Sequence, residues 1–157
     1  MIPAEFPDWS RKMDKWGYQL HDSAKAIASM AAIGMGVHQN TFTDRMQGGA
    51  HLLAPTGSDL HKYDKGTILA GFHYDISFMT IHGKSRYPGL SLWTRDWEKV
   101  SLKFPPGCLF IQAGASFEHI TGGYVLGGFH EVTITEKTKE VMEAKKAAEA
   151  EKGIHRT

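Results

Sequence analysis

Apolar positions at helical spacing dominate the first part of the chain. Between residues 8 and 33 they recur every three or four positions, which is the spacing of one face of an α-helix. Pro7-Asp8 offers a start for this helix, and Gly34 offers a stop. The stripe consists of Trp9, Met13, Trp16, Leu20, Ala24, Ile27 and Ala31. We expect this stripe to pack on the outer face of a sheet.

The middle of the chain changes to short apolar runs separated by Gly, Pro and Asp. A short helix is expected first, after Asn40 and ending at Gly48-Gly49. The runs that follow predict strands, and their close spacing is typical of an antiparallel sandwich or barrel. The expected strands cover residues 67–72, 75–82, 90–95, 98–103, 107–113 and 124–132.

The last region is rich in Ala, Glu and Lys and predicts a helix over residues 135–152. Thr135 suits its N-cap, and Gly153 suits its end. The whole pattern predicts an α+β protein with a mainly β core between an N-terminal and a C-terminal helix. We expect a single domain, with a helical lead-in over 1–49, the core over 50–132, and a helix and tail over 133–157.

Composition narrows the class of protein. At 157 residues the chain can bury a sizeable core, and its net charge of +1 gives no basic field for nucleic acid. The longest largely apolar run, from Ala26 to Val37, is too short to span a bilayer, and the N-terminus does not resemble a secretory signal. The single cysteine, Cys108, excludes an internal disulfide framework. We therefore expect a cytoplasmic protein that binds neither nucleic acid nor membranes; its oligomeric state is not determined by the sequence.

Three residues in the β region are candidate ligands of one metal ion. His73 and Asp75 lie two positions apart, and side chains at that spacing on a strand share a face. His130 follows in a later apolar run and can complete one triangular face of a metal ion. Two imidazoles and one carboxylate suit Fe(II), with three positions open for a cosubstrate and oxygen. The spacing alone leaves a second interpretation open, in which His73 and Asp75 belong to an ordinary polar network.

An ordered set of motifs adds to this triad. In chain order they are Leu53-Ala54-Pro55, His73-x-Asp75, Phe78-Met79-Thr80-Ile81, Gly89-Leu90-Ser91-Leu92, Arg95-Asp96, the segment Pro105 to Gly114, and His130-x-Val132. From about Leu52 to Val132 the chain thereby resembles the Fe(II)- and 2-oxoglutarate-dependent dioxygenases of the isopenicillin N synthase-like group. The resemblance implies a double-stranded β-helix, or jelly-roll. It also implies that His73, Asp75 and His130 are the iron ligands, with no further catalytic side chain.

The chain departs from the family pattern at several positions. Glu131 follows the distal His, where many members have Arg, and the Pro-containing segment lacks the usual Tyr. The family's Arg-x-Ser motif, which grips the distal carboxylate of 2-oxoglutarate, has one nearby match, Arg156 in His155-Arg156-Thr157. Arg156 is therefore the candidate cosubstrate-binding residue. The alternative is a solvated tail residue.

The resemblance implies an oxidoreductase that uses Fe(II) and 2-oxoglutarate to oxidise a C–H bond of a small organic substrate, whose identity the sequence does not reveal. Two alternatives stay open. One is a catalytically inactive dioxygenase-like domain that acts as a binding or structural module; the missing Ser after Arg156 and the early start of the chain favour it. The early start also leaves open that the chain is a fragment. The other is a Zn or Mn hydrolase or cupin-like enzyme, for which the sequence supplies no extra ligands.

Overall fold

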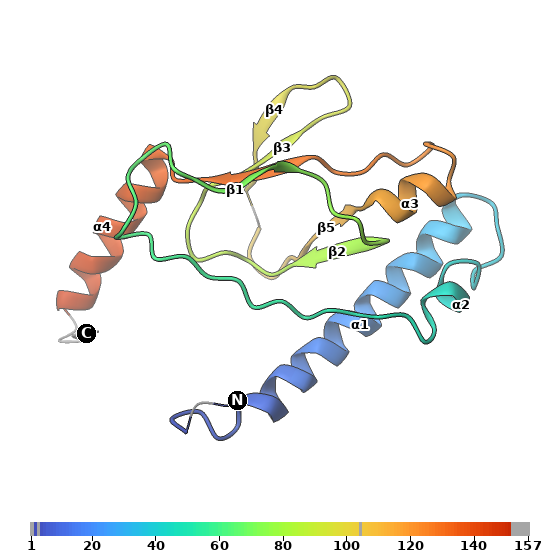
Figure 1. Cartoon of the computed structure of the whole chain (residues 1–157), viewed down its shortest axis with the longest axis horizontal. Helices are drawn as coiled ribbons and strands as arrows, with labels where there is room; N and C mark the ends of the chain where they lie inside the picture. Colours follow the sequence, from blue (N-terminus) through green and yellow to red (C-terminus); the bar gives the residue numbers. More distant parts are fainter. Residues whose placement is uncertain (1, 3, 104, 152–157) are drawn as a thin grey trace. The chain divides into compact units, whose positions relative to one another are not determined.

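The computed structural model describes residues 2, 4–103 and 105–151, and the chain divides into two compact units, Met1–Thr56 and Gly57–Thr157 (Figure 1). Each unit has its own set of secondary-structure elements. Among the described residues, no helix combines the length and the apolar character that crossing a membrane requires. The expected single domain, with boundaries after residues 49 and 132, stays a prediction.

The first unit contains the two helices expected from the sequence, α1 (Trp9–Gly34) and α2 (Thr43–Met46). Helix α1 ends where Gly36 takes a left-handed conformation with φ 72°, and the amide of Val37 bonds back to the carbonyl of Ala32. This is the arrangement by which a glycine commonly ends a helix.

The expected burial of the α1 stripe is wrong for its largest members. Trp9 and Trp16 are each 43% exposed, whereas the fully buried positions of the helix are Ala28 and Ala32. The buried face of the helix therefore centres on these two alanines and not on the tryptophans. Packing of α1 on the β region stays a prediction.

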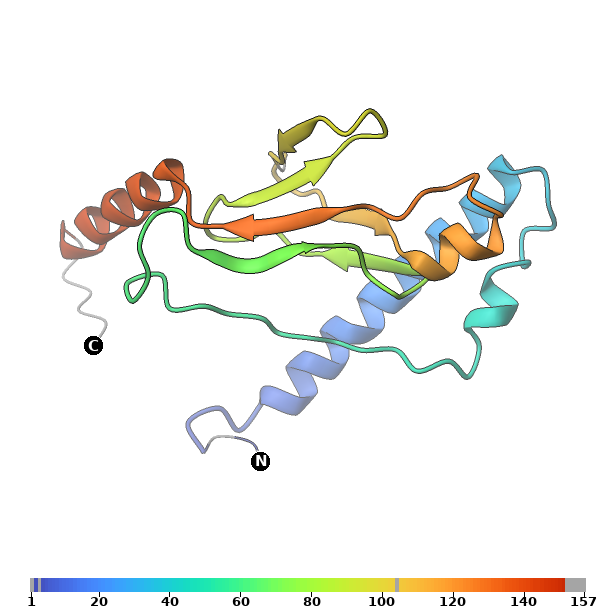
Figure 2. The same ribbon diagram turned by 45° about the horizontal axis from the view of Figure 1, so that its top comes forward.

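The second unit contains two antiparallel sheets (Figures 1 and 2). The larger sheet has the strand order β1-β6-β3-β4, and the smaller one pairs β2 with β5. Figure 2 shows β1 and β6 side by side, with the smaller sheet as a separate layer. The strands are β1 (Ile68–His73), β2 (Met79–His82), β3 (Leu90–Trp93), β4 (Lys99–Ser101), β5 (Phe110–Ala113) and β6 (His130–Thr133).

Each expected strand is present, but most are shorter than predicted, above all those expected over 75–82 and 124–132. Residues 75–78 lie outside β2 because their carbonyls bond to a helix instead of a sheet: Asp75 accepts from the amide of Ala115 at 2.7 Å, and Ser77 accepts from that of Ser116 at 3.2 Å. Residues 124–129 lie outside β6 for a similar reason. There the Glu118 carboxylate accepts from the Gly127 amide at 2.6 Å.

The helix whose first amides donate to the 75–78 carbonyls, α3 (Ala115–Ile120), was not predicted from the sequence. It begins after Gly114, where the chain passes under the 75–78 segment. A Cβ on Gly114 would lie 2.1 Å from the Ser77 carbonyl oxygen, which no side chain tolerates. This glycine therefore permits the close crossing that places Asp75.

Helix α4 (Glu136–Glu151) follows β6 and confirms the predicted Thr135 cap. The amide of Thr138 donates to Thr135 Oγ1 at 3.1 Å, and the amide of Thr135 donates to Thr138 Oγ1 at 2.9 Å. Thr138 is buried and also donates to the Pro88 carbonyl at 2.8 Å. The reciprocal cap thus fixes α4 to the loop that precedes β3. Gly153, the expected helix end, lies outside the described residues.

Helices and antiparallel sheets together confirm the expected α+β class. The described apolar core of the second unit includes Phe117, Ile134 and Met142, which come from α3, the end of β6 and α4. All the candidate metal ligands belong to this unit.

Candidate metal centre

His73, Asp75 and His130 come together where β1 ends and β6 begins. The antiparallel register places His73 opposite His130, and their ring centroids are 4.2 Å apart. Asp75 lies two residues beyond the end of β1, in a non-strand segment. The expected strand alternation is therefore not what brings Asp75 to the histidines; the crossing over Gly114 does this instead.

The potential ligand atoms are close enough to share an ion. Asp75 Oδ1 lies 3.6 Å from His73 Nε2 and 3.9 Å from His130 Nε2, and the ligand atoms all lie within 4.8 Å of one another. Adjacent ligands of an octahedral ion with bonds of about 2.1 Å lie roughly 3 Å apart. Small side-chain rotations therefore suffice to close the site. In the part of the chain that the structure describes, this is the one such group of three.

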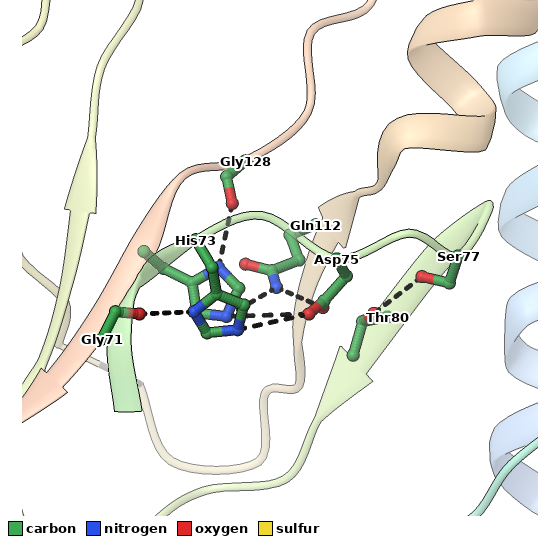
Figure 3. Close-up of polar contacts among 8 residues, drawn as sticks. Gly71, His73, Asp75, Ser77, Thr80, Gln112 and Gly128 are labelled. Carbon is green, nitrogen blue, oxygen red and sulfur yellow. Dashed lines mark hydrogen bonds and ion pairs between the residues drawn. The ribbon is translucent and has the colours of Figure 1, made fainter. Parts of the chain in front are cut away.

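Backbone carbonyls fix the tautomer of both imidazoles. His73 Nδ1 lies 2.6 Å from the Gly71 carbonyl, and His130 Nδ1 lies 2.9 Å from the Gly128 carbonyl (Figure 3). Since a carbonyl only accepts, each Nδ1 carries the proton and donates it. Each Nε2 then keeps its lone pair, which is the form that binds a metal.

The centre is closed on one side and open on the other. The His130 side chain is 5% exposed, that of Asp75 is 24% exposed, and that of His73 is 45% exposed. Solvent and small molecules therefore reach the group from the His73 side, while His130 faces the protein interior.

Asp75 is held in its charged form. Burial raises the pKa of its carboxyl group, but hydrogen bonds from Thr80 and Gln112 and the electrostatic effect of the His130 and His82 imidazoles outweigh it, so that the pKa lies below the ordinary value. Gln112 Nε2 donates to Asp75 Oδ2 at 2.7 Å (Figure 3). A carboxylate that is anionic and accepts hydrogen bonds is a suitable ligand for a divalent ion.

Three polar side chains of the smaller sheet face the centre and were not singled out from the sequence. They are Thr80 and His82 on β2 and Gln112 on β5. Thr80 and His82 are two positions apart on one strand, and Thr80 pairs with Gln112 across the ladder. Strand alternation in Thr80-Ile81-His82 predicts that Thr80 and His82 lie on one face. Only the pairing of β2 with β5 shows that Gln112 lies beside them.

His82 is a second imidazole on the closed side. Its ring centroid lies 5.9 Å from that of His130, and its Nε2 is buried with no hydrogen-bond partner among the described residues. Burial, with a smaller electrostatic effect of the His130 imidazole, lowers the pKa of His82 despite the opposing effect of Asp75. These surroundings favour the neutral form of the ring.

The predicted cosubstrate-binding residue, Arg156, lies outside the described residues. Glu131, which follows the distal His, forms an ion pair with Lys99, and its side chain is 13% exposed. Arg95 Nη2 donates a hydrogen bond to the Tyr124 carbonyl oxygen at 3.4 Å. The three ligand candidates are thus brought together, while the cosubstrate contact stays a prediction.

Fold and site together define a class of protein: two antiparallel sheets with a two-histidine, one-carboxylate group between their strand ends. In sequence, no family model and no curated protein matches this chain. Solved structures do match. One, from Caulobacter crescentus and assigned to the 2OG-Fe(II) oxygenase family, is 23% identical with a TM-score of 0.68. The alignment covers 87% of this chain and 44% of that one.

A protein of Neurospora crassa is also similar. Its full-length structure with alpha-KG, that is 2-oxoglutarate, is 18% identical with a TM-score of 0.71, over 87% of this chain and 44% of that one. Its complex with alpha-KG and thymine is 16% identical with a TM-score of 0.65, over the same shares. The chain thus spans less than half the length of these proteins. Its fold is that of 2OG-Fe(II) oxygenase structures, which confirms the resemblance at the level of the fold.

Proposed function

We propose that this chain is an Fe(II)- and 2-oxoglutarate-dependent dioxygenase, or its metal-binding core, that oxidises a C–H bond of a small organic substrate. Its two sheets form the jelly-roll of that family, and the protein is cytoplasmic. His73, Asp75 and His130 are the iron ligands. The observation that carries this proposal is the convergence of their ligand atoms within 4.8 Å of one another.

The donor set fits the metal. Two neutral imidazole nitrogens and one carboxylate are the ligands of non-haem Fe(II) oxygenases, and they leave positions open for external ligands. When bound, Fe(II) with 2-oxoglutarate supplies oxidative decarboxylation, which yields succinate and carbon dioxide and is coupled to oxidation of a C–H bond. The protein contributes the geometry and the exclusion of water on the closed side.

Each side chain has a distinct part in this arrangement. The Gly71 and Gly128 carbonyls keep the two Nε2 atoms unprotonated, so the imidazoles bind without first losing a proton. The low pKa of Asp75 keeps its charge available. The exposed His73 side is where cosubstrate and substrate enter. We retain Arg156 as the residue that binds the far carboxylate of 2-oxoglutarate, because Arg offers a two-pronged contact to a carboxylate.

The test is the conversion of 2-oxoglutarate and dioxygen to succinate and carbon dioxide without any added substrate, with ascorbate supplying the two electrons that a substrate C–H bond would otherwise provide. The Fe(II)-loaded protein is expected to release succinate. Asp75→Ala is expected to reduce the release to the background rate, because the ion loses the only anionic ligand that the protein supplies. Asp96→Ala, which removes an exposed carboxylate from the turn between β3 and β4, is the matched control and is expected to have no effect.

Succinate release that is unchanged in Asp75→Ala, or absent from the iron-loaded wild type, would contradict the proposal. The second of these outcomes, together with intact iron binding, is what the alternative predicts. That alternative is an inactive dioxygenase-like module. The observation that favours it is Glu131, paired with Lys99 directly after the distal ligand, where many family members have Arg.

A further inference from the structure

Gln112 joins the smaller sheet to the metal centre. It lies on β5 and is only 5% exposed. Its Nε2 donates to Asp75 Oδ2 at 2.7 Å and lies 3.3 Å from His130 Nε2. One amide group therefore touches two of the three ligand side chains, as Figure 3 shows for Asp75.

The orientation of this amide is determined by its neighbours. With the amide reversed, Gln112 Oε1 would face Asp75 Oδ2, and two acceptors would meet at hydrogen-bond distance. In the observed orientation Oε1 is buried and has no hydrogen-bond partner among the described residues. A buried carbonyl without a hydrogen bond is destabilising. The bond between Nε2 and Asp75 is therefore kept although it leaves Oε1 without a partner.

The two oxygens of Asp75 consequently differ. Oδ2 accepts the hydrogen bond from Gln112, whereas Oδ1 is the atom that lies 3.6 Å from His73 Nε2 and 3.9 Å from His130 Nε2. Oδ1 is therefore the oxygen that pairs with both imidazoles, and Oδ2 is the one that Gln112 holds. Thr80, the cross-strand partner of Gln112, supplies another hydrogen bond to the same carboxylate.

We propose that Gln112 is a positioning residue that keeps Asp75 a one-oxygen ligand and thereby preserves three open coordination positions instead of two. This inference rests on the proposed metal centre. Carboxylates bind metal ions through one oxygen or through both. With its hydrogen bond to Gln112 in place, Oδ2 is turned away from the ion. Without it, Oδ2 is free to swing toward the ion and take a fourth position.

The number of open positions matters for the proposed reaction. A 2-oxo acid that chelates through its keto and carboxylate oxygens occupies two positions. A third has to remain for another external ligand. A two-oxygen Asp75 would leave only the positions that the cosubstrate fills, so the cosubstrate would still bind but its decarboxylation would slow.

Two substitutions remove the contact in different ways. Gln112→Met keeps the length of the side chain without a donor, and it also removes the unpartnered Oε1, so we expect the variant to fold. Gln112→Asn keeps an amide but is one methylene shorter and does not reach Oδ2. Thr138→Val is the matched control, because it removes buried hydrogen bonds at the start of α4, away from the centre. Circular dichroism verifies the fold of each variant.

The measurement is the number of exchangeable waters on bound Mn(II), obtained from water-proton relaxation. Wild type and Thr138→Val are expected to hold about three waters, and Gln112→Met and Gln112→Asn about two. If either folded Gln112 variant binds Mn(II) and keeps the wild-type number of waters, the inference is overturned while the metal centre stands. If the wild type does not bind Mn(II), the metal centre and the inference are both overturned.

Discussion

At the scale of the residue, two imidazoles, those of His130 and His82, lie on the interior side of the centre and differ in their hydrogen bonds. His130 has its Nδ1 proton committed to a carbonyl, whereas His82 has a buried Nε2 without a partner among the described residues. His82 also stacks on Phe110, with 5.7 Å between the ring centroids. His82 therefore packs beside the site as an uncharged ring, and protonation of its imidazole would weaken this packing.

This predicts a pH-dependent stability that His82 controls. Because burial lowers its folded-state pKa, the unfolded chain takes up the proton first as the pH falls. The free energy of unfolding of the metal-free protein should therefore decrease below about pH 6.5 and level off below the lowered folded-state pKa. His82→Leu should remove that contribution.

The measurement is urea unfolding of the metal-free protein at several pH values between about 4.5 and 8. His61→Leu is the control, since His61 is exposed and should leave the slope unchanged. An identical slope in the wild type and in His82→Leu would show that His82 is not held neutral by its surroundings.

The grouping of His73, Asp75 and His130 could be predicted from the sequence, whereas the side chains that surround it could not. His73, Asp75 and His130 stand in a recognisable order of motifs. Gln112 contacts Asp75 because of the β2–β5 register and the crossing over Gly114, and neither is encoded in a local pattern. Long-range register depends on the whole packing of the unit, so a position such as Gln112 becomes visible only in three dimensions.

At the scale of the element, the larger sheet separates two different faces. Phe72 precedes His73 on β1, where alternation turns it to the side opposite that imidazole, and Phe129 directly precedes His130, just outside β6. Their rings stack at 4.8 Å with 10° between the planes, and Trp93 of β3 meets Phe72 edge-on at 4.6 Å. Ring packing on one face therefore holds β1, β6 and β3 in the register that brings the histidines together on the other.

The position of Asp75 depends on the close crossing between the 75–78 segment and the start of α3. Gly114→Ala would place a Cβ 2.1 Å from the Ser77 carbonyl and 2.8 Å from that of Asp75. Since both atoms belong to the backbone, the segment has to move. We expect a loss of about 1–3 kcal/mol in the free energy of unfolding, together with weaker metal binding.

Gly83→Ala is the matched control, because a Cβ there meets no atom within 4 Å. Denaturant unfolding gives the stability of each variant, and titration with Mn(II) gives the affinity. A Gly114→Ala protein as stable as Gly83→Ala, with unchanged metal affinity, would mean that the crossing does not position Asp75.

Helices and strands were predicted correctly where apolar residues recur at a regular spacing. The long helix and the positions of all six strands followed from spacing, although Asp75 proved to lie in a loop. Helix α3 was missed because six residues are too few for a periodic pattern. The Trp9 and Trp16 stripe was expected to be buried because it is apolar, but the buried positions of α1 are Ala28 and Ala32.

At the scale of the whole molecule, the centre is assembled within one unit. Its ligands and supporting side chains all lie between residues 73 and 130 of the Gly57–Thr157 unit. The fold is shared with oxygenases about twice as long, such as the Caulobacter crescentus protein, of which the chain spans 44%. Metal binding is therefore a property that this chain can be tested for by itself.

The most direct test of the account is the stoichiometry of Fe(II) binding, measured by anaerobic calorimetric titration of the metal-free protein. The wild type is expected to bind one ion per chain. Asp75→Ala and His130→Ala are expected to lose binding, and the control variants Asp96→Ala and His61→Ala to retain it. No binding by the wild type, or one ion per chain in Asp75→Ala, would contradict the claim that His73, Asp75 and His130 form the metal centre.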